Sequence, residues 1–212
     1  MFTNALLPDT LRVIKLINQN RIIKDAYLAG GTALALQIGH RISVDLDFFT
    51  LKEFDENTLE IELQKTGFYK GDGKAWKTIW GMISQTKFSL FYYPYKIISD
   101  YINFEGINLI SKPDIAAMKI NAIETRGSKR DFIDLFFLAK DYSIEQMLEF
   151  YNLKYQTLQD HLYIIIRSLG YFEDAEMDEK SPQMLIDVSW PEVKNFFQKE
   201  SLRLAKEKLN IP

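Results

Sequence analysis

The chain reads LAGGTALALQIGHRISVDLDFFT from Leu28 to Thr50, and this segment carries the clearest local structural pattern in the sequence. A short apolar run, Ala26–Ala29, ends at two glycines, and helix-forming residues then continue up to Gly39. Residues 44–49 alternate carboxylate and apolar side chains, which is typical of a half-buried strand. The stretch therefore predicts a strand, a tight turn, a short helix and a second strand.

The turn in this stretch has the features of a phosphate-binding site. Gly30 and Gly31 let the backbone turn sharply and approach a ligand closely. The helix that follows offers N–H groups without helical partners and the positive end of its dipole to an anion. Thr32 adds a hydroxyl donor. Taken alone, a Gly-Gly-Thr sequence is also common at turns between a strand and a helix.

Two carboxylates follow on the predicted second strand. Asp45 and Asp47 are two residues apart, so they face the same way, about 7 Å apart at Cα. An isolated Asp-x-Asp is often the solvated face of an amphipathic strand, but this one follows a candidate phosphate turn. Mg²⁺ prefers hard oxygen ligands and commonly takes one or two carboxylates plus substrate phosphates. The pattern predicts a Mg²⁺ site, with Mn²⁺ as a substitute, and chemistry at the α-phosphorus of a nucleotide.

Composition narrows the class of protein. The 212 residues are 47% hydrophobic and 26% charged, which suits one compact domain or two small ones. Zero cysteines exclude disulfides, thiolate nucleophiles and cysteine-based metal sites. The formal charge of -3 means that a nucleic acid would need a local basic surface. No apolar run is long enough for a membrane helix, and Met1–Asn20 is unlike a signal peptide, so we expect a cytoplasmic protein.

The remaining pattern divides near Ser111. Before it we expect helices at Pro8–Asn20 and Asp55–Lys65, and then antiparallel strands. The expected strands are Ala75–Ile83, Thr86–Tyr93, Ile97–Asn103 and Ile107–Ile110. After it we expect the helices Pro113–Thr125, Lys129–Lys140, Ile144–Lys154, Leu158–Leu169 and Pro191–Leu209. Glu173–Pro182 is acidic and has no period, which predicts a mobile loop. The prediction is thus a core over residues 1–110 and a helical domain over residues 111–212.

The second half has its own candidate residues. Lys119 emerges from an apolar helix face, where a lysine either snorkels or reaches a cleft. Asp131 follows Ser128 by three residues, a spacing that resembles a capping box and leaves a structural role open beside a catalytic one. Aromatic residues in the β segments fill a core more often than they stack on bases. They are Trp76, Trp80, Phe88, Phe91, Tyr92, Tyr93 and Tyr95.

At these residues the sequence resembles the AbiEii toxin family of nucleotidyltransferases, part of the DNA polymerase β-like superfamily. The resemblance rests on Gly30-Gly-Thr32, on Arg41-Ile-Ser-Val-Asp45, on Asp45-Leu-Asp47 and on the later block KINAIETRGSKRDFIDL, residues 119–135. It spans residues 26–138. It implies an α+β fold, a polymerase β-like nucleotidyltransferase core with a mixed sheet, followed by a C-terminal helical domain that completes the nucleotide cleft.

The resemblance also implies roles for individual residues. Asp45, Asp47, Lys119 and Asp131 would be catalytic, and the first two would hold the metal. Residues implied to bind the nucleotide are Gly30, Gly31, Thr32, Arg41, Ser43 and Lys119. The implied reaction transfers a nucleotide from an NTP to a hydroxyl acceptor, such as tRNA or another RNA. The implied role is that of the toxin in a toxin–antitoxin or phage-defence system, with a cognate antitoxin as partner.

One position departs from the superfamily. Many members carry a third carboxylate on a later strand as the base for the hydroxyl proton, and the corresponding strand here is Lys87–Phe91, with Ser89 near that position. A serine cannot act as that base at neutral pH. The proton then goes to Asp131, to water or to a metal-bound group. The alternative is a catalytically weak nucleotide- or protein-binding module of the same fold.

Overall fold

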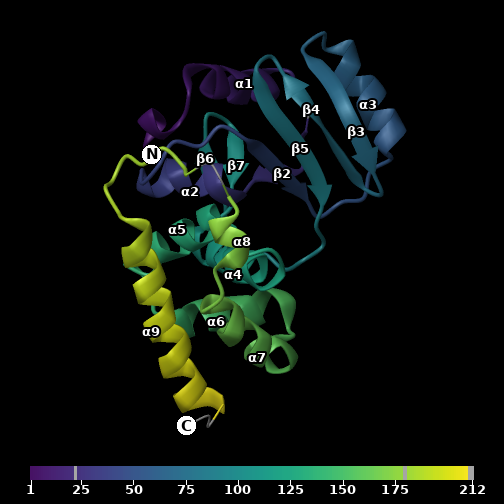
Figure 1. Ribbon diagram of the computed structural model, residues 1–212. Coiled ribbons are helices and arrows are strands. Elements are labelled where there is room, and N and C mark those ends of the chain that lie inside the picture. The colour runs from purple at the N-terminus through teal and green to yellow at the C-terminus, as the bar shows by residue number, and fades with distance from the viewer. Residues whose placement is uncertain (22, 179–180, 210–212) are drawn as a thin grey trace. The chain divides into compact units, whose positions relative to one another are not determined.

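The computed structural model shows two compact units, each with its own core (Figure 1). The N-terminal unit comprises Met1–Tyr95 and Ser99–Ser111. The helical unit comprises Lys96–Ile98 and the described residues from Lys112 onward. The structure describes residues 1–21, 23–178 and 181–209.

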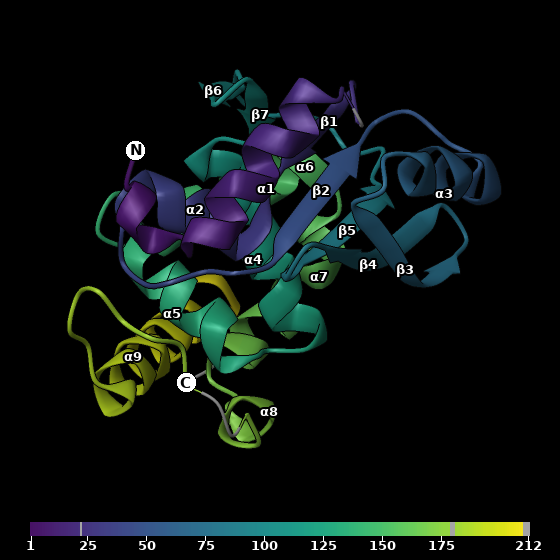
Figure 2. The same ribbon diagram turned by 90° about the horizontal axis from the view of Figure 1, so that it is seen from above.

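The N-terminal unit is a mixed sheet with helices. Its helical elements are η1 (Thr3–Ala5), α1 (Pro8–Gln19), α2 (Gly30–Ile38) and α3 (Glu56–Lys65). Its strands are β1 (Ala26–Leu28), β2 (Leu46–Thr50), β3 (Tyr69–Ala75), β4 (Thr78–Ile83), β5 (Thr86–Tyr92), β6 (Ile102–Phe104) and β7 (Ile107–Leu109). The strand order in the described residues is β3-β4-β5-β2-β1-β7-β6. Figure 2 shows β3 at one end of this sheet and the β6–β7 hairpin at the other.

The sheet is mixed because β2 pairs parallel to β5 and antiparallel to β1, while β1 pairs parallel to β7. This confirms the predicted α+β class. Along β2 the buried Leu46 and Phe48 alternate with the partly buried Asp47 and Phe49. Phe48 packs on Phe88 of β5, with ring centroids 5.9 Å apart. One face of β2 is therefore core, and the other carries a carboxylate.

The helical unit contains the remaining helices. They are α4 (Lys112–Thr125), α5 (Lys129–Leu138), α6 (Ile144–Tyr155), α7 (Leu158–Leu169), α8 (Glu173–Glu176) and α9 (Trp190–Leu209). Its core centres on Phe132, whose ring contacts those of Phe172, Trp190 and Phe197 at 5.0–6.1 Å between centroids. Among the described residues, no helix has the length and apolarity needed to cross a membrane.

A buried ion pair holds the short segment Lys96–Ile98 in the helical unit. Asp114 on α4 and Lys154 on α6 have fully buried side chains, and Lys154 Nζ lies 2.8 Å from Asp114 Oδ1. Lys154 also donates to the Lys96 carbonyl at 2.9 Å. The Ile98 N–H donates to the Asp114 carboxylate at 3.0 Å. The buried pair thus forms its remaining hydrogen bonds with backbone groups of this segment.

Two expected strands were placed wrongly. Ala75–Ile83 was predicted as one strand, whereas Tyr69–Ala75 and Thr78–Ile83 are two strands joined by a turn. The first of them was missed because its glycines disfavour a strand. Ile97–Asn103 was also predicted as a strand, but β6 begins only at Ile102, because the backbone at Ile98 bonds to Asp114 rather than to a neighbouring strand.

The segment Glu173–Pro182 was predicted as a loop. Its first four residues form the short helix α8, because the buried Ala175 packs inward. Glu179 and Lys180 lie outside the described residues.

Candidate active site

The glycine turn forms where predicted and places a carboxylate beside the start of α2. Gly30 has φ +65°, a left-handed conformation that L residues with a side chain rarely adopt. A Cβ built on Gly30 would lie 3.6 Å from Asp47 Oδ2. The backbone at Gly30 and the Asp47 carboxylate are therefore in close approach, where first-turn N–H groups have no partner within the helix.

Thr32 connects the start of α2 to the segment that carries Asp45. Its side chain is 3% exposed, and its hydroxyl donates to the Asp45 carbonyl. Thr32 and Ser43 hydroxyl oxygens lie 2.8 Å apart, and since Thr32 has used its proton, Ser43 is the donor to Thr32. Thr32 was expected to give its hydroxyl to a phosphate. In this structure that hydroxyl instead fixes the position of Asp45.

The two carboxylates come from alternate positions of one extended segment. Asp45 lies one residue before β2 and is partly buried, as is Asp47, while Leu46 between them is fully buried. This two-residue alternation places both carboxylates on the face opposite the core. Two carboxylates and a helix N-terminus make a donor set of hard oxygens and N–H groups, which fits Mg²⁺ bound together with a polyphosphate.

Ser89 lies directly beside Asp47. The parallel register of β2 and β5 pairs Asp47 with Ser89, so the two side chains are neighbours on the same face of the sheet. The strand neighbour of the Asp-x-Asp segment is therefore a hydroxyl and not a third carboxylate. Within the described residues, no cluster of three or more histidine and acidic side chains has the arrangement of a metal site.

Arg41 and Ser43 lie in the loop between α2 and β2. Arg41 is 4% exposed, and its guanidinium donates to the Ile42 carbonyl at 3.2 Å. The Ser43 N–H donates to the Ala5 carbonyl at 2.9 Å. Both predicted nucleotide-binding residues thus hold the loop in place, and a direct contact with nucleotide stays a prediction.

The later candidate block forms a buried charge cluster inside the helical unit. Lys119 Nζ on α4 lies 2.8 Å from Asp131 Oδ1 and 2.6 Å from Asp134 Oδ2, both on α5. The side chains of the three residues are 8%, 1% and 0% exposed, respectively. Lys119 is therefore not a mobile point charge but the shared cation of two carboxylates, held between two helices.

Asp131 has two further partners. Arg126 Nε lies 3.0 Å from Asp131 Oδ2, and the Ser128 hydroxyl donates to the same oxygen at 2.7 Å. Burial raises the pKa of Asp131, but Lys119 and Arg126 outweigh it and hold that pKa well below its usual range. Asp131 is therefore firmly ionised, and a carboxylate of such low pKa is a poor proton acceptor.

The predicted capping box at the start of α5 is not formed. Ser128 is the N-cap residue, but its side chain accepts no hydrogen bond from the helix backbone. Its hydroxyl donates to Asp131 instead. The structure also adds Arg126 and Asp134 to the cluster, which sequence reasoning missed as site residues. Their charge and their spacing around Asp131 were the available signal.

Comparison with known proteins accounts for this combination. A profile described as nucleotidyl transferase AbiEii toxin, of a type IV toxin–antitoxin system, matches residues 18–72, which contain the glycine turn and both carboxylates. An uncharacterized protein of Aquifex aeolicus is 36% identical over 185 residues, covering 84% of this chain and 87% of that protein. The chain belongs to the AbiEii nucleotidyltransferase toxin family.

Solved structures show the same fold as this AbiEii family member. JHP933 from Helicobacter pylori superposes with a TM-score of 0.55 at 18% identity, covering 95% of this chain and 93% of that one. MenT4, a nucleotidyltransferase toxin from Mycobacterium tuberculosis, superposes with a TM-score of 0.54 at 13% identity, covering 93% and 85%. At these identities the likeness establishes the nucleotidyltransferase fold. We infer the substrates of this AbiEii chain from its own residues.

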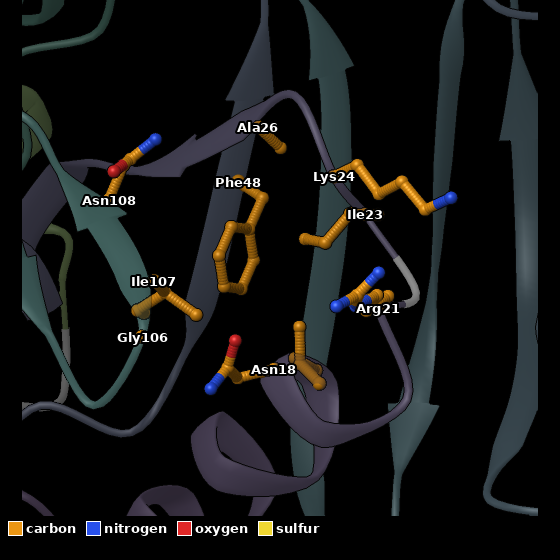
Figure 3. A pocket seen from close by; sticks show the side chains of 10 residues that line it. Asn18, Arg21, Ile23, Lys24, Ala26, Phe48, Gly106, Ile107 and Asn108 are labelled. Atoms are coloured by element: carbon orange, nitrogen blue, oxygen red, sulfur yellow. The ribbon is translucent and has the colours of Figure 1, made fainter.

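A pocket of about 270 Å³ in the N-terminal unit is separate from the carboxylates (Figure 3). Phe48 lines it, and Phe48 points to the opposite face of β2 from Asp47. Asn18, Arg21 and Lys24 line it from the end of α1 and the following loop (Figure 3). The pocket therefore lies on the other side of β2 from the candidate site of this AbiEii protein.

Proposed function

We propose that the chain is a Mg²⁺-dependent enzyme that transfers a nucleotide from an NTP to a hydroxyl of an RNA acceptor such as tRNA. The observation that carries the proposal is the position of the Asp47 carboxylate against Gly30 at the start of α2, with Asp45 fixed by Thr32. This arrangement places anionic metal ligands beside N–H groups that can donate hydrogen bonds to phosphate. Few sites need both, and nucleotidyl transfer is one that does.

In the proposed reaction the start of α2 and the two carboxylates have different roles. The N–H groups at the start of α2 bind phosphate oxygens of the NTP and orient the α-phosphorus. Asp45 and Asp47 would hold the ion, and Mg²⁺, or Mn²⁺ in its place, supplies Lewis acidity toward the phosphates and lowers the pKa of a bound hydroxyl. The acceptor oxygen forms a bond to the α-phosphorus as the bond to pyrophosphate breaks.

The acceptor proton needs a destination. Ser89 cannot take it, and the low pKa of Asp131 makes that carboxylate a weak base. We therefore infer that the proton passes to water. This is a slower route than transfer to a third carboxylate, and we expect turnover to rise with pH as hydroxide becomes available. Completion of the nucleotide cleft by Lys119 and Asp131 stays a prediction.

The experiment uses purified protein, Mg²⁺, each NTP labelled at the α-phosphate, and total RNA. We expect label in RNA with the native protein and a loss of at least about 100-fold in Asp45→Asn and Asp47→Asn. EDTA should abolish labelling, and added Mg²⁺ or Mn²⁺ should restore it. Asp72→Asn, an exposed carboxylate on β3, is the matched control and should label normally. Equal labelling by all four proteins would refute the proposed chemistry.

The toxin role is tested in cells. We propose that the protein arrests growth when expressed alone and that a cognate antitoxin protein relieves the arrest. Expression of the native chain should slow growth, while Asp47→Asn at the same protein level should not. Growth arrest by both would separate toxicity from nucleotide transfer.

A second candidate function follows from Ser89. Because the neighbour of Asp47 lacks a carboxylate, the chain could serve as a catalytically weak nucleotide- or protein-binding module. That function predicts Mg²⁺-dependent NTP binding, measured by calorimetry, without label transfer to any RNA. Transfer abolished by Asp47→Asn excludes it.

A further inference from the structure

Asp47 begins a row of side chains that runs across three further strands. The register pairs Asp47 of β2 with Ser89 of β5, Ser89 with Trp80 of β4, and Trp80 with Gly73 of β3. Side chains paired across adjacent strands lie on the same face. At about 4.8 Å between strands, the Trp80 backbone lies roughly 10 Å from that of Asp47. Figure 2 shows these four strands as consecutive neighbours.

Trp80 is an exposed aromatic ring on this face. It is 39% exposed, whereas Phe88 on the opposite face of the same strands is fully buried. A Cβ built on Gly73 would lie 2.4 Å from Trp80 Cζ2 and 2.7 Å from Cε2. The indole therefore lies against the Gly73 backbone, in a place that only a glycine leaves open. The expectation that Trp80 fills a core was wrong, because its ring lies along the surface.

Two lysines flank the ring on the same face. Lys87 pairs with Met82, and Met82 pairs with Lys70, one two-residue step along the strands from the row of Trp80. Both lysines are exposed, and neither forms an ion pair within the described residues. Lys74, by contrast, pairs with Ile79 on the core side and binds Glu60 at 2.6 Å.

We propose that this face, defined by Lys70, Trp80 and Lys87, binds the single-stranded end of the polynucleotide acceptor. One base stacks on Trp80, and the flanking phosphates bind the two lysines. Every base has a π-face, so such stacking tolerates different sequences. The proposal rests on the proposed function, because it places the strand beside the carboxylates that would act on its terminal hydroxyl.

Charge favours a polynucleotide over the NTP itself as the occupant. The start of α2 and the two carboxylates already account for one metal-bound triphosphate. Lys70 lies on β3, three strands from Asp47, while Lys87 lies on β5, the strand next to β2. Two cations spread over this width, without an ion pair in the described part of the chain, call for additional phosphates, which a strand supplies and a single NTP does not. An NTP base stacked on Trp80 is the competing arrangement, and the experiment separates the two.

The experiment measures binding in the inactive Asp47→Asn background, so that turnover plays no part. The probe is a fluorescein-labelled single-stranded RNA ending in CCA, followed by fluorescence anisotropy with Mg²⁺. We expect Trp80→Ala to weaken RNA binding by at least about five-fold, since stacking contributes about 1–3 kcal/mol per base. Trp80→Phe should retain most of the affinity. Trp76→Ala removes a more exposed tryptophan from the adjoining turn and should bind normally.

The lysines are tested by salt dependence. The double variant Lys70→Met with Lys87→Met should lower the slope of log affinity against log salt by about 1.4, because each single-strand phosphate contact contributes about 0.7. Lys74→Met, the control on the core side, should leave the slope unchanged. Thermal unfolding of each variant verifies the fold, and Gly73→Ala displaces the indole without removing it, so it should weaken RNA binding as Trp80→Ala does.

Two results would overturn the proposal. One is an unchanged RNA affinity in both Trp80→Ala and Gly73→Ala. The other is a loss of NTP affinity in Trp80→Ala, measured by calorimetry with the native carboxylates present, while RNA binding persists. Either result leaves the labelling experiment with Asp45→Asn and Asp47→Asn untouched, so failure of this inference is distinguishable from failure of the proposed function.

Discussion

Removal of the Lys119 ammonium tests the buried charge cluster. Lys119→Met retains the length and apolar stem of the side chain but leaves Asp131 and Asp134 without their shared cation. The two carboxylates are 1% and 0% exposed and lie 2.8 and 2.6 Å from Lys119 Nζ. Breaking a buried pair from one side typically costs about 3–5 kcal/mol. We expect a loss of about that size in the free energy of unfolding, because both buried carboxylates lose the ammonium that contacts them.

The chain offers a matched control on the same helix. Lys112 Nζ lies 2.7 Å from Asp141 Oδ2, but the two side chains are 33% and 44% exposed. Exposed pairs contribute about 0–1 kcal/mol, so Lys112→Met should have little effect. Urea unfolding followed by circular dichroism measures both variants, and adding Asp134→Asn to Lys119→Met should recover part of the loss. Equal destabilisation by the two lysine variants would refute our account of the cluster.

Three further predictions follow from the same geometry. Gly30→Ala forces a non-glycine residue to φ +65°, which costs about 1–2 kcal/mol, and brings a methyl group toward Asp47, so urea unfolding should show that loss and labelling should fall at least ten-fold. The folded-state pKa of Asp131 is depressed, so ionised Asp131 stabilises the fold fully above its unfolded pKa of about 3.9, and this stabilisation is lost as pH falls toward the folded value. Urea unfolding at decreasing pH should therefore show a smaller loss of stability in Asp131→Asn than in the native protein. Ser89→Asp restores a carboxylate beside Asp47 and should raise kcat, whereas Ser89→Ala should leave it near the native value; equal rates would contradict a missing base.

The strand–turn–helix–strand of residues 26–50 could be predicted because its determinants are local. Gly30 ends one element and starts another, and the alternation from Asp45 to Phe48 fixes one face of β2. The position of Ser89 beside Asp47 was anticipated only through the family resemblance, which placed Ser89 near the third carboxylate of the superfamily. The choice of β5 over another strand depends on long-range pairing, which a single sequence does not encode locally.

The helical cluster shows where sequence reasoning reached its limit. Helix periodicity located Lys119 and Asp131, but it could not show that α4 and α5 bring them within 2.8 Å. Asp134 and Arg126 were not counted among the site residues, because charged side chains are usually solvated. β3 was missed for a different reason: Gly73 is tolerated in the strand because the Trp80 indole occupies the space that its side chain would fill.

The hydrogen bonds that Asp114 and Lys154 form with residues 96–98 limit how the two units could have been combined in evolution. Because three residues of the helical unit lie before the last strands of the N-terminal unit, no single cut in the gene separates the two. A recombination event at residue 111 would deliver helices with two buried opposite charges that lack both of their backbone partners, the Lys96 carbonyl and the Ile98 N–H. Exchange of whole genes, rather than of halves, is the route that keeps both units intact.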